Sequence, residues 1–322
     1  MTDAETVDVS TIRERVEQRD DVDAAEGVLT AIEERAEDGR IAVDAMADWY
    51  RECRGRHRST VADVDDAADR LDGLLSSIEP ADREGNQLDS RVEEYEGHID
   101  AIRANLSTVA DRLDATATRP ESPVAIYEAA DRLRECEGMI HEIAHSLHHL
   151  VEEFDEFETW LVEPAARIEG LEAEIDGFER YLDNTEGLLA GIETGSTGST
   201  EPFDAWLAAH HLQEMTTLVF EELRSDIAEL AAWLERRDGS YGDEVAALRD
   251  RLDALEGRHA ACSKRLDAAT VEVEGFERKR ADVAESVERF EAALADHEPP
   301  VDWSGVEELV QSQFDDLGIQ LR

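Results

Sequence analysis

The chain has 322 residues, 41% of them hydrophobic and 35% charged, and its 80 acidic and 32 basic residues give a formal net charge of -48. So acidic a surface argues against direct nucleic-acid binding, which needs basic groups to neutralise phosphates. The sequence contains no run of roughly 18 apolar residues, and its acidic start is unlike a signal peptide. We therefore expect a cytoplasmic protein without membrane insertion.

Lysine is nearly absent, because only Lys264 and Lys279 occur and every other basic residue is Arg. An acidic, Lys-poor surface suits a protein kept soluble in multimolar salt, where the Debye length falls to about 3 Å or less and self-repulsion is screened. We interpret the charge as the solvent adaptation of a halophile. The one basic cluster, from Arg51 to Arg58, is expected to pair with acidic neighbours, and an anion or acidic-partner site is the alternative.

Residues 1–40 are expected to form short N-terminal helices, the first of them opened by a capping box of Thr11 and Glu14. From residue 41 to 163, apolar positions recur at spacings of four and three over three long stretches, which is the pattern of helices with one buried seam. Turn signals with Pro and Gly separate these stretches at 80–86 and 119–123. The pattern predicts a first three-helix bundle at 41–163.

Residues 164–298 are predicted to form a second helical bundle. The apolar register continues through Pro164, either as two helices joined nearly coaxially or as one helix kinked there. After a linker at 195–200 and a helix at about 203–237, the chain reverses into the stretch 241–297. Its seam keeps the four-and-three spacing, so we predict a single coiled-coil helix about 85 Å long. Residues 299–322 are expected to be a C-terminal docking tail.

Short loops between long helices force antiparallel neighbours. We therefore predict an all-α fold of elongated antiparallel coiled-coil helical bundles in a spectrin-repeat-like arrangement. The helix at 241–297 is about twice as long as its predicted neighbour at 165–192, which leaves roughly 30 Å of its seam uncovered. The N-terminal helices, the tail or a second copy of the chain could cover it. We expect protein partners on helical faces and, as one alternative, a homodimer through the seam of 269–297.

One segment matches a catalytic motif. His141, Glu142 and His145 fit HExxH, in which two histidines one helical turn apart bind zinc and the glutamate acts on the bound water. His148 follows on the same face, but this face lies opposite the apolar seam, and no third protein ligand follows at a suitable spacing. We therefore predict no catalytic residue and no cofactor, and His141, His145 and His148 stay the candidates for a metal site.

The three cysteines, Cys53, Cys136 and Cys262, share no metal-ligand spacing, and each falls on an apolar seam position. We expect them to be small buried side chains in a reducing compartment. A reactive or ligating thiol is the alternative interpretation.

Three stretches resemble the haloarchaeal "halo transducer protein" family: VEEFDEFETWLVEP at 151–164, LRSDIAELAAWLER at 223–236 and EPPVDWS at 298–304. Together with the helix order, the resemblance covers most of residues 120–310. It implies a cytoplasmic, non-enzymatic coiled-coil protein with a link to signal transduction and without catalytic residues. Chemoreceptor signalling domains dock a kinase through a glutamate-rich hairpin tip, and the reversal at 238–242 has no such flanks.

The leading hypothesis is a non-enzymatic scaffold or adaptor that acts through protein–protein contacts. Two alternatives remain: a zinc-dependent hydrolase built on His141, Glu142 and His145, and a self-assembling structural rod. The seam of 241–297, rather than the HExxH helix, is the expected place of function.

Overall fold

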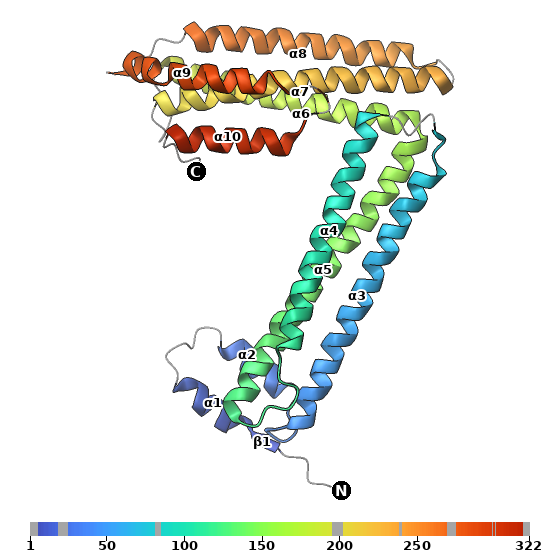
Figure 1. Cartoon of the computed structure of the whole chain (residues 1–322), viewed down its shortest axis with the longest axis vertical. Coiled ribbons are helices and arrows are strands. Elements are labelled where there is room, and N and C mark those ends of the chain that lie inside the picture. Colours follow the sequence, from blue (N-terminus) through green and yellow to red (C-terminus); the bar gives the residue numbers. More distant parts are fainter. Residues whose placement is uncertain are drawn as a thin grey trace. The chain divides into compact units, whose positions relative to one another are not determined.

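The computed structural model describes residues 6–18, 25–80, 85–194, 202–237, 240–268, 275–297, 299 and 301–317. These residues form ten helices and one pair of three-residue strands (Figure 1), which confirms the all-α prediction. The chain divides into two compact units, one of residues 1–79 and 91–158 and the other of residues 80–90 and 159–322. Within the described residues, no helix combines the length and hydropathy needed to cross a membrane.

Three long helices run side by side in the first unit (Figure 1): α3 (Val43–Ser77), α4 (Asn86–Asp114) and α5 (Pro123–Val162). Most of their predicted seam positions are buried, so the four-and-three spacing identifies most of the side chains that form this core. The buried seam residues include Cys53, Val64, Leu71, Ile99, Leu106, Val109, Leu133, Cys136 and Ile140. Burial of such side chains contributes about 1.5–3 kcal/mol each, so the seams dominate the stability of this unit.

A small N-terminal subassembly precedes α3. Strands β1 (Thr6–Asp8) and β2 (Arg40–Ala42) pair antiparallel, and helices α1 (Val9–Glu17) and α2 (Ala25–Glu33) lie between them in the chain. The predicted capping box is wrong, because α1 begins at Val9 and the Asp8 carboxylate accepts the Ser10 N–H at 3.0 Å. The strands were not predicted, since three residues are too short to show a two-residue period.

The second unit has a three-helix core of α6 (Pro164–Thr194), α7 (Pro202–Arg237) and α8 (Gly242–Ala268). Helix α5 ends at Val162 and α6 begins at Pro164, so the chain forms two helices here rather than one kinked helix. The predicted seams of the three helices meet in one apolar cluster. It comprises Ile168, Leu171, Ile175, Leu182, Phe220, Leu223, Ile227, Leu230, Leu234, Val245, Leu248, Leu252 and Leu255, together with Trp233.

A ladder of ion pairs flanks this core. Arg251, Arg258 and Arg265 recur every seven residues on α8, and each reaches carboxylates of α6. Their partners are Asp176 for the first, Asp183 at 2.6 Å for the second and Glu193 at 3.0 Å for the third. Exposed pairs of this kind contribute about 0–1 kcal/mol each, so the ladder sets register and direction more than stability.

The prediction of one continuous helix over 241–297 is wrong. Helix α8 ends at Ala268, and α9 (Phe276–Leu294) begins after Gly275, whose φ of 88° is incompatible with a helix; residues 269–274 lie outside the described residues. Glycine adopts this left-handed conformation without steric cost.

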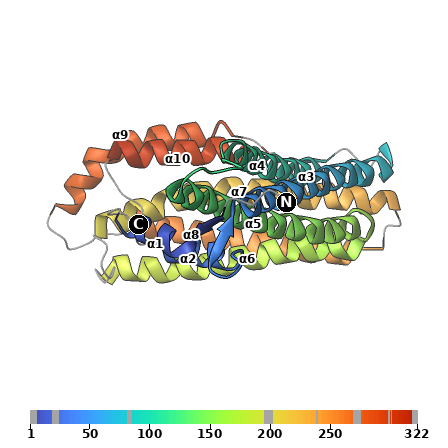
Figure 2. The same ribbon diagram turned by 90° about the horizontal axis from the view of Figure 1, so that it is seen from below.

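The described part of this seam beyond Gly275 is covered by the chain itself, and the C-terminal tail, one of the three predicted alternatives, supplies part of the cover. The α9 residues Phe276, Val287, Phe290 and Leu294 are buried. Helix α9 packs on α7, and α10 (Trp303–Leu317) lies along α9 (Figure 2). Val301 and Val306 of the C-terminal segment close a cluster with Leu218 of α7, so the predicted docking of the tail is seen.

Helix α7 carries a buried carboxyl group. Asp226 of α7 is 8% exposed, and burial first, then the charges of Glu174, Glu222 and Glu229, raise its pKa from 3.8 to about 7. The folded chain therefore binds this proton more tightly than the unfolded chain does. The free energy of unfolding therefore falls as pH rises from about 4 to about 7, and above about pH 7 it falls no further on account of Asp226.

Asp226→Asn tests this assignment. The amide carries no charge to bury, so we expect the variant to exceed the wild type in free energy of unfolding by an amount on the order of 2 kcal/mol at pH 8. The difference should vanish near pH 4, where the wild-type carboxyl group is protonated. Chemical unfolding at both pH values measures it, with the exposed Glu235→Gln on the same helix as the control. A gain that does not depend on pH would contradict the assignment.

Candidate functional site

The predicted metal candidates His141, His145 and His148 all lie exposed on α5. His145 Nε2 is 3.1 Å from His149 Nε2, and His148 Nε2 is 3.5 Å from a Glu152 carboxylate oxygen. Among the described residues, these histidines are not joined by a further ligand into a metal-binding group. The HExxH segment therefore lies on the solvent face that the seam pattern predicts for it.

The basic cluster on α3 pairs with acidic side chains. Arg54 is 2.8 Å from Asp114, and Arg56 is 3.0 Å from Glu137. Arg51 pairs with Asp48 on its own helix. These contacts confirm the interpretation of a solvated face that pairs with acidic neighbours.

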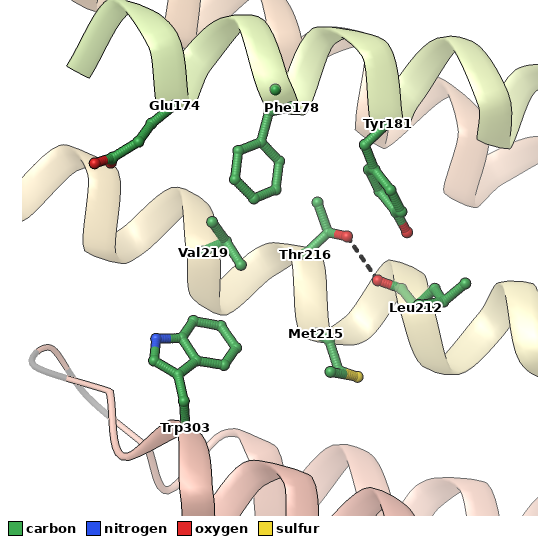
Figure 3. Close-up of a pocket in the computed structure, with 9 residues that line it drawn as sticks. Glu174, Phe178, Tyr181, Leu212, Met215, Thr216, Val219 and Trp303 are labelled. Carbon is green, nitrogen blue, oxygen red and sulfur yellow. Dashed lines mark hydrogen bonds between the residues drawn. The ribbon is translucent and has the colours of Figure 1, made fainter. Parts of the chain in front are cut away.

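An apolar groove opens on the second unit between α6, α7 and the start of α10. Figure 3 shows Phe178 and Tyr181 of α6 on one side, Met215 and Val219 of α7 below them, and Trp303 on the other side. The groove has a volume of about 280 Å³ and is also lined by Glu174, Gly177, Leu212 and Thr216. Gly177 has no side chain, so the groove is wider at this position of α6.

Two of the large apolar side chains that stay exposed in the described chain line this groove. Leu212 is 40% and Trp303 is 37% exposed. The indole N–H of Trp303 donates to a Glu222 carboxylate oxygen at 2.8 Å, which fixes the ring at the mouth. Residues 299–322 are expected to dock as a tail, and among them Val301 and Val306 are buried whereas Trp303 stays exposed. An exposed, oriented indole is typical of an interaction surface.

A second cluster joins α7 to α9. His210 and Glu214 are one helical turn apart on α7, and Glu291 faces them from α9. Ligand atoms of the three side chains all lie within 4.8 Å of one another, with His210 Nε2 at 3.6 Å from Glu291 Oε1. All three side chains are half-buried. The pair on α7 could have been noticed from its spacing of four, whereas Glu291 is brought in by the break at Gly275.

Burial controls the protonation of this cluster. It is the main reason that the pKa of His210 is lowered and that the pKa values of Glu214 and Glu291 are raised. Repulsion from Asp267 also raises the pKa of both carboxyl groups. The imidazole is therefore neutral near pH 7, and its Nδ1 is buried without a hydrogen-bond partner among the described residues.

Comparison with known proteins adds no assignment to either site. No protein-family model, no curated protein and no solved structure matches the chain.

The three cysteines are buried free thiols, as the sequence predicts. Burial raises the pKa of Cys53 to about 12 and raises the pKa values of Cys136 and Cys262 as well. Because the thiolate is the nucleophile, such thiols are inert.

We expect iodoacetamide at pH 8 to leave all three thiols unmodified in the folded chain and to alkylate all three in guanidinium chloride, because unfolding exposes them and restores their ordinary pKa. Mass spectrometry of the intact chain measures both states. Rapid alkylation of any one of them in the folded chain would point to a reactive site at that cysteine.

Proposed function

We propose that this chain is a non-enzymatic helical scaffold or adaptor that binds a partner protein in the groove between α6, α7 and α10. The observation that carries the proposal is the exposure of Leu212 and Trp303 around an apolar hollow in an otherwise highly charged chain. Isolated exposed apolar residues need no explanation, but their convergence on one groove does.

The occupant that fits best is an amphipathic helix of a partner protein, with apolar anchors and basic flanks. Helices bind such grooves through residues at i, i+3 or i+4, and i+7, which lie along one face. Glu174 lines the groove, and Glu222 lies at its mouth beside the indole of Trp303. With a net charge of -48 on the chain, complementarity favours a basic flank on the partner.

The finer architecture belongs to the same proposal. Seams with a four-and-three spacing and the heptad ladder of Arg251, Arg258 and Arg265 support coiled-coil packing of the spectrin-like kind. The resemblance to the "halo transducer protein" family supports a link to signal transduction. The hydrolase alternative is not favoured, because His141 and His145 are exposed side chains of a single helix.

Site-specific photo-crosslinking tests the groove. A benzophenone amino acid replaces Met215 in the groove or, as the control, the exposed Ala254 of α8. Irradiation in native cell extract should give a distinct heterologous product only from the groove position. An excess of unlabelled wild-type chain should abolish this product, because it competes for the same helix. Identical products from both positions would contradict the proposal.

A groove variant used as the unlabelled competitor gives a second test of the groove. Leu212→Glu places a carboxylate at the groove edge, and we expect it to compete at least about tenfold more weakly than the wild type, a loss of about 1.4 kcal/mol. Leu212 is already exposed, so the fold should persist, and far-UV circular dichroism checks this. A homodimeric product would instead identify a second copy as the occupant and favour the self-assembling rod.

A further inference from the structure

The cluster of His210, Glu214 and Glu291 has the composition and spacing of a metal site. The three groups offer one imidazole nitrogen and two carboxylate oxygens within 4.8 Å of one another. Ligands of a tetrahedral ion with bonds of about 2.1 Å lie about 3.4 Å apart. The 3.6 Å between His210 Nε2 and Glu291 Oε1 is close to that value, and the Glu214 carboxylate lies within 4.8 Å of both groups.

The charges of the cluster also fit a divalent cation. Two carboxylates held half-buried beside Asp267 repel one another, and a dication with a neutral imidazole makes the set of three ligands electrically neutral. Removing this repulsion is favourable in a site withdrawn from water.

The mixed ligand set selects the class of ion. Mg²⁺ and Ca²⁺ prefer oxygen ligands alone, whereas imidazole together with carboxylates suits Zn²⁺ and related transition metals. A water molecule can complete the coordination where the protein supplies three ligands.

We propose that His210, Glu214 and Glu291 bind one zinc-class divalent ion that fastens α9 to α7. This site is separate from the groove, so its failure would leave the proposed function untouched. Arg280 is the cation near the site, and its guanidinium lies 5.0 Å from the Trp206 ring and donates to the Asp267 carbonyl. Through these contacts the Arg280 guanidinium lies near the cluster, and among the described residues it forms no ion pair with the carboxylates of Glu214 and Glu291.

Zinc titration of the full chain tests the proposal. The exposed histidines of α5 are first removed as His141→Ala, His145→Ala, His148→Ala and His149→Ala, so that they cannot bind zinc. Calorimetry with Zn²⁺ should give one ion per chain, and the midpoint of thermal unfolding should rise with zinc because the ion binds only the folded chain. Mg²⁺ at the same concentration should reproduce neither effect.

Substitutions distinguish the loss of a metal ligand from the loss of a nearby negative charge. In the same background, His210→Gln and Glu291→Gln should each weaken zinc binding at least about tenfold, since each removes one ligand. Glu285→Gln removes an exposed charge elsewhere on α9 and should leave the affinity unchanged. The midpoint without metal checks that each variant folds. Absent binding, binding retained in both ligand variants, or equal weakening in Glu285→Gln would overturn the proposal.

Discussion

The burial of one apolar seam on α8, between α6 and α7, is the constraint on which the second unit depends. A chain with a net charge of -48 repels itself in every compact arrangement, and seam burial is the main term that opposes this. Leu248 and Leu252 of α8 are each 1% exposed. The arginine ladder runs beside the seam at the same period, so one repeat fixes both the packing and the placement of the few positive charges.

The break before α9 determines which candidate sites form beside this core. A continuous rod would have extended past the ends of its neighbours, leaving its own seam exposed. With Gly275 in the left-handed conformation, α9 instead packs on α7, where Phe290 and Leu294 join Leu218. That return also brings Glu291 to His210 and leads the chain into α10 and Trp303. Both candidate sites therefore depend on one departure from the predicted continuous helix.

The sequence predicted features that depend on local periodicity. The seam leucines, the buried cysteines and the solvent face of His141 and His145 follow from a 3.5-residue repeat, which reports burial directly. The sequence could not predict the break at Gly275, because the apolar spacing continues across this residue and a glycine is tolerated within a helix. Glu291 and Trp303 acquire their neighbours through that break, so their roles depend on tertiary contacts that no local pattern contains.

Both candidate sites use residues of α7. Met215 lines the groove and also packs against the cluster formed by Phe290, Leu294 and Val306. The preceding residue, Glu214, offers its carboxylate to the cluster with His210 and Glu291. The groove and this cluster share no residue, so loss of the ligands would leave the groove intact. What the two sites have in common is the packing of α7 on α9, to which Met215 contributes.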